Sequence, residues 1–156
     1  MIRPATPSDV PTILRFVREL AAFEREPDAV EATEASLHEA LFGADPAAEA
    51  VIAEDGEPLG FALFFHKFST WTGRRGLYLE DLYVTPAARG RGVGSALLRH
   101  LAGIALDRRC ARFEWAVLDW NADAIAFYRG VGAVGMEDWT VQRVSGETLV
   151  RLAGRR

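Results

Sequence analysis

The segment "TPAARGRGVGSALLRH", residues 85–100, constrains the fold of this chain more than any other stretch. Gly90, Gly92 and Gly94 follow an apolar, strand-like run and precede a run of helix-forming residues. Glycines let backbone N–H groups approach an anion without a Cβ in the way, and the first N–H groups of a helix have no partner within it. The segment therefore predicts a strand, a phosphate-binding turn and a helix.

The residues around the glycines narrow the choice of phosphate compound. Arg89 and Arg91 place positive charge in the same turn. The Walker pattern does not fit because no lysine follows Gly94, and the dinucleotide pattern does not fit because Ser95 stands where its third glycine belongs. A plain glycine-rich connector is the alternative interpretation, and the two arginines argue against it.

Apolar periodicity predicts the other elements in the order β-α-α-β-β-β-α-β-α-β-β. This order indicates a mixed α/β domain whose first half is mostly antiparallel. Helices are expected over residues 9–24, 33–42, 93–107 and 121–132. Strands are expected over residues 1–6, 76–86 and 111–119, with one hairpin over residues 50–68 and a terminal hairpin around Ser145-Gly146.

Composition limits the possible partners. The length of 156 residues predicts a single domain over residues 1–156. One cysteine and three scattered histidines argue against a disulfide framework and against a metal site. No apolar run suits a membrane span or a secretory signal, so we expect a cytoplasmic protein without a membrane partner. The net charge of −4 argues against nucleic acid and is compatible with a small cationic substrate.

Residues 89–94 match the [RQ]-x-x-G-x-[GA] pyrophosphate loop of the GNAT acetyltransferases. With "IRPAT", "STWTGRRGLYLEDLYV" and "WNADAIAFY", the chain resembles the diamine branch of that superfamily, which includes spermidine/spermine and thialysine acetyltransferases. The resemblance implies one GNAT-type domain with a mixed, mostly antiparallel sheet flanked by helices. It also implies acetyl-CoA as co-substrate, a primary amine as acceptor attacking directly, and a homodimer.

An acceptor amine with a pKa near 10.4 must lose a proton before it attacks, and a carboxylate can accept that proton directly or through water. Glu80 and Asp81 interrupt an apolar strand, and adjacent strand residues face opposite ways. Two exposed acids at a sheet edge are the alternative. The resemblance assigns the amine-binding glutamate and base to Glu80, and we expect a structural part for Asp81.

A phenol can protonate a departing thiolate, and Tyr128 is the candidate. From the residues alone, a core aromatic with a satisfied hydroxyl is the favoured interpretation of Tyr128, and Asn121 can simply cap its helix. The family spacing N-x6-Y assigns Asn121 to CoA and Tyr128 to acid catalysis. The full set of expected cofactor contacts is Leu82, Tyr83, Val84, Arg89, Gly90, Arg91, Gly92, Val93, Gly94, Ser95, Asn121 and Tyr128.

The resemblance also implies that Leu82, Tyr83 and Val84 act through backbone N–H groups exposed by a bulge. The expected acceptor contacts are Arg15, Glu24, Trp71, Glu80 and Trp120. The alternative for Arg15 is an ordinary solvated residue on its helix, and the alternative for each tryptophan is a packing residue. Relatives that use polyamines carry an acid where this chain has Ser69, which favours a shorter amine or a lysine-like amino acid. The alternatives are a protein or peptide N-acetyltransferase, which needs an open groove at residues 66–76, and a non-catalytic acyl-CoA-binding module.

Overall fold

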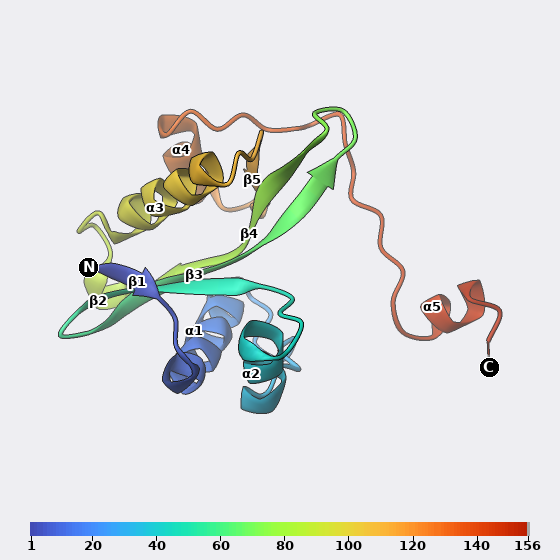
Figure 1. The fold of residues 1–156 in the computed structure, drawn as a ribbon, viewed down its shortest axis with the longest axis horizontal. Helices are drawn as coiled ribbons and strands as arrows, with labels where there is room; N and C mark the ends of the chain where they lie inside the picture. The colour runs from blue at the N-terminus through green and yellow to red at the C-terminus, as the bar shows by residue number, and fades with distance from the viewer. Residues whose placement is uncertain (156) are drawn as a thin grey trace. The chain divides into compact units, whose positions relative to one another are not determined.

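The computed structural model describes residues 1–155 and divides the chain into two compact units, Met1–Ala116 and Val117–Arg156. The first unit contains, in chain order, β1 (Ile2–Pro4), the 3-10 turn η1 (Pro7–Asp9), α1 (Val10–Phe23), α2 (Glu34–Phe42), β2 (Glu49–Asp55), β3 (Glu57–Ser69), β4 (Arg74–Val84), the 3-10 turn η2 (Pro86–Ala88), α3 (Val93–Asp107) and β5 (Phe113–Trp115) (Figure 1).

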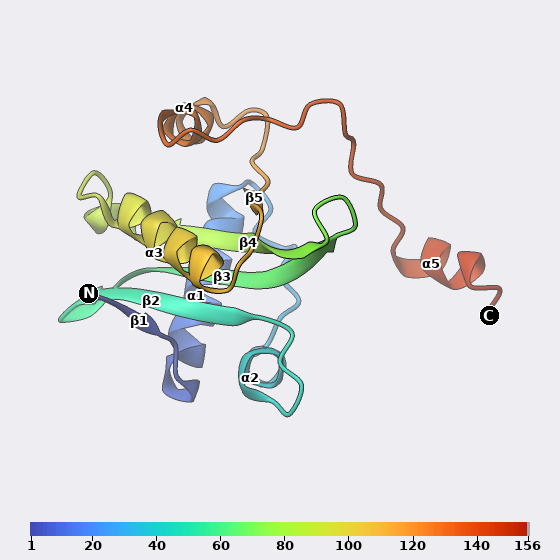
Figure 2. The ribbon, with the colours of Figure 1, turned by 45° about the horizontal axis from the view of Figure 1, so that its top comes forward.

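The sheet of the first unit has the order β1-β2-β3-β4-β5. All neighbours pair antiparallel except β4 and β5, which are parallel. Helices α1 and α2 cover one face of the sheet and α3 covers the other (Figure 2). The predicted α/β class, with a mixed and mostly antiparallel sheet flanked by helices, is therefore confirmed.

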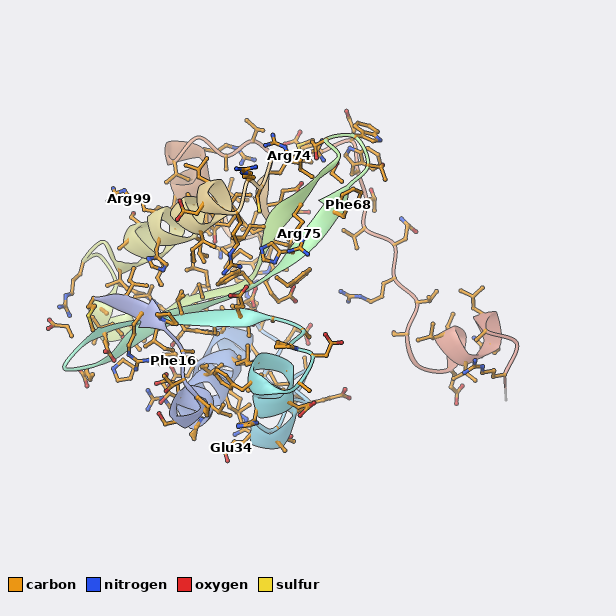
Figure 3. All side chains as sticks on the ribbon, in the orientation of Figure 1. Phe16, Glu34, Phe68, Arg74, Arg75 and Arg99 are labelled. Atoms are coloured by element: carbon orange, nitrogen blue, oxygen red, sulfur yellow. The ribbon has the colours of Figure 1, made fainter. Side chains whose placement is uncertain are left out.

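The core on the α1 side is built around Phe16, which is fully buried. Its ring centroid lies 5.8 Å from that of Phe61 on β3 and 5.5 Å from that of Tyr83 on β4 (Figure 3 labels Phe16). Apolar residues at helical spacing on α1, including Ile13 and Leu14, bury the same face. Burial of this helix stripe fixes α1 against the middle of the sheet, where its C-terminal end reaches β4 and the turn after it.

A bulge interrupts β4 at Glu80. Leu63 of β3 pairs with Asp81, whereas the next residue, Phe64, pairs with Leu79, so Glu80 is the extra residue. Beyond Leu79, β4 is not paired with β5, because the ladder between the two strands covers only Leu77–Leu79 of β4. The strand predicted over residues 111–119 is accordingly shorter than expected, since β4 turns away from the line that β5 would continue.

The second unit contains α4 (Ala122–Gly130) and α5 (Gly146–Leu152). The terminal hairpin expected around Ser145-Gly146 was wrong, because residues 131–145 form no strand and α5 begins where the second strand was expected. Alternating apolar residues make a strand only when a neighbour pairs with them. Without one, Glu147 in the first turn and Arg151 in the last complement the helix dipole and favour a short helix.

None of the helices in residues 1–155 is long and apolar enough to cross a membrane.

Candidate active site

The glycine turn connects β4 to α3. Gly90 and Gly92 have φ values of 78° and 80°, a region that favours glycine, and a Cβ built on either would meet no atom within 4 Å. Gly92 is also the N-cap of α3, so the helix begins without a capping side chain. Its first internal hydrogen bond runs from Ala96 N to Gly92 O at 3.0 Å, which leaves three N–H groups outside the helix ladder. These groups, from Val93, Gly94 and Ser95, face an open turn that suits a phosphate.

Arg89 braces this turn. Its Nε donates to Val84 O at 3.1 Å, and its guanidinium lies 5.2 Å from the ring of Phe23 and 5.8 Å from that of Tyr83. Arg91 is exposed, with a guanidinium nitrogen 3.8 Å from an Asp55 carboxylate oxygen. The two arginines do bring positive charge to the turn, but Arg89 also ties the turn to the end of α1. No local sequence pattern indicates the contact between Arg89 and Phe23.

The bulge changes which backbone groups of β4 point away from β3. Leu77 N donates to Arg112 O beside β5, whereas Thr85 N donates to Leu59 O beside β3. Successive N–H groups of a strand alternate in direction, so an uninterrupted β4 would point both the same way. The extra residue at Glu80 reverses the alternation. The N–H groups of Leu82 and Val84 therefore point toward the β5 side, and Tyr83 N–H points toward β3.

Three carboxyl groups meet between the bulge and the end of α1. Burial, together with the charges of Glu80 and Glu24, raises the pKa of Asp81 to about 6. Glu24 is the C-cap of α1, and burial raises its pKa as well. Glu80 is exposed beside them. The negative end of the α1 dipole lies at the same point, so this carboxyl cluster concentrates negative charge that attracts a cation. Asp81, expected to be structural, thus lies in one cluster with Glu80 and Glu24.

Two expected acceptor contacts lie apart from this cluster. Arg15 precedes Glu24 by two and a half turns of α1, about 14 Å along the axis and on the opposite helix face. It stands exposed, 3.9 Å from Glu19. Trp71 sits in the tip of the β3–β4 hairpin and is 78% exposed. From Arg74, where the hairpin ladder begins, to Glu80 the strand rises about 20 Å, so Trp71 does not reach Glu80 within one chain.

The remaining candidates belong to the second unit. Asn121 caps α4, since its side-chain oxygen accepts from Ala124 N at 3.2 Å. The capping function considered from the sequence is therefore confirmed. Tyr128 lies in the last half of α4, with its ring centroid 5.5 Å from that of Phe127. Trp120 precedes the cap and is 41% exposed.

Among residues 1–155, no three histidine, cysteine or acidic side chains are grouped so that they could hold a metal ion.

Comparisons with known proteins agree with this arrangement. Residues 14–133 match the model of the acetyltransferase (GNAT) family. A thialysine N-epsilon-acetyltransferase of Sus scrofa is 41% identical over 99% of this chain and 98% of its own length. An L-ornithine N5-acetyltransferase of Arabidopsis thaliana is 29% identical over 95% of this chain and 85% of its own. The solved structure of an integron cassette protein from V. cholerae superposes with a TM-score of 0.81 at 28% identity, over 98% of this chain and 96% of that one.

Proposed function

This chain belongs to the acetyltransferase (GNAT) family and is an acyltransferase, and from that premise we propose that it transfers the acetyl group of acetyl-CoA to a primary amine of a small cationic acceptor. The observation that carries the proposal is that one strand has an open glycine turn at its end and the carboxyl cluster at its bulge. One feature suits the phosphates of the donor and the other the charge of the acceptor.

Acetyl-CoA supplies the activated acetyl group as a thioester. The N–H groups of Val93, Gly94 and Ser95 bind its pyrophosphate, in a turn that Gly90 and Gly92 keep open and Arg89 and Arg91 charge. The outward N–H groups of Leu82 and Val84 donate hydrogen bonds to the pantetheine arm and to the thioester oxygen, which they stabilise as it gains negative charge. Tyr83, whose side chain is buried, holds this segment in place.

The carboxyl cluster of Glu24, Glu80 and Asp81 holds the acceptor. Glu24 and Asp81 attract the ammonium group, and Glu80 takes one of its protons, directly or through water. The free amine then attacks the thioester carbonyl carbon, forming the amide as the bond to sulfur breaks. Tyr128 gives its phenolic proton to the departing thiolate, and Asn121 contacts CoA beside it. The roles of Glu24, Glu80, Asn121 and Tyr128 follow the family resemblance, and that of Asp81 is supported by its place in the carboxyl cluster.

We further propose a diamino acid as acceptor. Thialysine and L-ornithine, named in the two relatives, each carry a second amine and a carboxylate. Ser69 removes the acid that polyamine-using relatives carry at that position, which favours these shorter substrates over spermine. Arg15, Trp71 and Trp120 remain proposed acceptor contacts. A homodimer, a single functional domain over residues 1–156 and a cytoplasmic location complete the proposal.

A thiol-release assay with acetyl-CoA and a panel of amines tests this function. We expect free CoA to appear with thialysine or ornithine, and more slowly with spermine. Thiol release that requires a protein or peptide acceptor would instead identify a peptide acetyltransferase. Tight acetyl-CoA binding with no release on any amine would identify a non-catalytic acyl-CoA-binding module.

A further inference from the structure

The second half of β3 has one unpaired edge. The ladder between β2 and β3 ends at the pair Glu49–Phe64, whereas the ladder between β3 and β4 continues to Ser69–Arg74. In the described sheet, β3 has only β2 and β4 as neighbours, so residues 65–69 have no strand on their other side. Figure 1 shows the β3–β4 hairpin reaching beyond the end of β2. Backbone N–H and C=O groups along such an edge are available to an added strand.

A groove of about 770 Å³ follows this edge. One wall is apolar and comes from the end of α2 and the loop after it. The other is β3 itself, with Arg75 of β4 beside it. The groove is lined by Leu41, Pro46, Ala47, Ala48, Glu49, Phe65, His66, Lys67, Phe68 and Arg75. Phe68 is 67% exposed at the open end, and Figure 3 shows it on the hairpin with Arg74 and Arg75. None of these residues has a part in the proposed acetyl transfer.

The charge of the groove is positive although the chain as a whole carries −4. Glu49 is its one acid, and Arg108 neutralises it through two hydrogen bonds of 2.6 and 2.9 Å. Lys67 and Arg75 remain, with Arg74 next in sequence. Lys67 has one acid near it, Glu114, at 3.8 Å and with half of the lysine side chain exposed. An ion pair of that length and exposure is weak, so the positive charge of Lys67 stays available to attract an acidic ligand.

We infer that this edge binds an extended, acidic segment of a partner protein by adding it to the sheet as a strand. Main-chain hydrogen bonds to residues 65–69 would supply affinity, and alternate side chains would meet the two faces of β3. Acidic side chains suit Lys67 and Arg75, and small apolar ones suit Phe65 and Phe68. A second copy of this chain fits less well, because pairing the edge with itself would set the cationic residues of two copies against each other.

Fluorescence anisotropy with a labelled seven-residue peptide of alternating glutamate and valine, without acetyl-CoA, tests the inference at low ionic strength. We expect saturable binding that weakens about tenfold or more in Arg75→Glu, because the charge that attracts the peptide is reversed. Arg99→Glu, an exposed charge reversal on α3 outside the groove, is the matched control and should bind as the parent does. The same peptide N-methylated at alternate residues should lose about tenfold or more, since it cannot donate its full set of strand hydrogen bonds.

Circular dichroism establishes folding of each variant independently of enzymatic activity. Should Arg75→Glu fail to fold, Lys67→Gln and Phe68→Ser at exposed positions carry the same expectation. Equal binding by the parent and these variants, or by the methylated and unmethylated peptides, would overturn the inference. So would tighter binding of a single-stranded RNA that the same variants abolish. Concentration-dependent dimerisation that Arg75→Glu abolishes would assign the edge to a second copy instead.

Discussion

At the scale of single residues, the proposed chemistry involves two adjacent acids, Glu80 and Asp81, to which sequence reasoning assigned different parts. Strand alternation assigned Glu80 and Asp81 to opposite faces, and the resemblance favoured Glu80 as the base. The bulge at Glu80 breaks the alternation and brings both acids into one carboxyl cluster with Glu24. No local pattern of residue types specifies such a bulge, because it depends on the register against β3. The partial burial of Asp81 was therefore outside the reach of sequence reasoning.

Replacement of Asp81 by asparagine should stabilise the fold at high pH and weaken acceptor binding. The pKa of Asp81 in the folded protein is about 6, above its ordinary value of 3.8, so the folded state holds the proton more tightly than the unfolded chain. The ionised carboxylate consequently destabilises the fold above pH 6, and this cost disappears as the pH falls toward 4. Thermal unfolding of Asp81→Asn should show a higher Tm at pH 8 and little change at pH 4.

The same variant should raise the acceptor KM, since one carboxylate of the carboxyl cluster has been replaced by a neutral amide. Asp28→Asn, an exposed change elsewhere, is the control for both measurements. A Tm gain of equal size at pH 4 and pH 8 would contradict the raised pKa. An unchanged acceptor KM would show that Asp81 does not contribute to acceptor binding.

At the scale of elements, the strand–turn–helix unit was the most predictable part of the molecule. The predicted helix over residues 93–107 is α3 to the residue, because its start is fixed by glycines and its apolar face by periodicity. The brace from Arg89 to Phe23 could not be predicted, since it joins a turn to a helix that ends 66 residues earlier. The terminal hairpin was wrong because strand patterns predict propensity but not whether a partner strand is present.

Gly92→Ala should weaken acetyl-CoA binding more than it destabilises the fold. An alanine Cβ there meets no neighbouring atom, but φ of 80° is strained for alanine, and relaxing it would move the N–H groups of the turn. We expect the acetyl-CoA Kd to rise about tenfold, equal to about 1.4 kcal/mol, in isothermal titration calorimetry.

Gly103→Ala is the matched control for that measurement, because it lies within the same helix α3 with ordinary helical φ and open space. It should leave the Kd unchanged and raise the Tm slightly. Equal affinities for Gly92→Ala and the parent would show that the turn does not bind the donor.

At the scale of the whole molecule, the proposed donor turn and the proposed acceptor-binding carboxyl cluster lie in the first unit, and the proposed acid lies in the second. The sequence predicted the mixed sheet and its helices through periodicity and punctuation by glycine and proline. It could not predict that Trp71 and Glu80 would be separated by the length of a long hairpin, because strand length is set by the pairing of β3 with β4.

Tyr128→Phe tests whether the second unit takes part in the chemistry. The variant loses one hydroxyl group and keeps the ring that packs near Phe127. We expect kcat to fall roughly 10²–10⁴-fold, the range for general acid–base catalysis, with acetyl-CoA Kd nearly unchanged. Phe127→Leu, beside it on α4, controls for disturbance of the helix. Turnover at the parent level in Tyr128→Phe would mean that water or another group protonates the thiolate.

The most direct test of the central claim is the pH dependence of kcat/KM for thialysine in the parent and in Glu80→Gln, followed by thiol release. The substitution keeps the shape of the side chain but removes its charge and its capacity to accept a proton. We expect a large loss of kcat/KM near neutral pH that shrinks as the pH rises toward 10, where more of the amine arrives already deprotonated, with an unchanged acetyl-CoA Kd. A variant whose pH–rate curve coincides with that of the parent would contradict it.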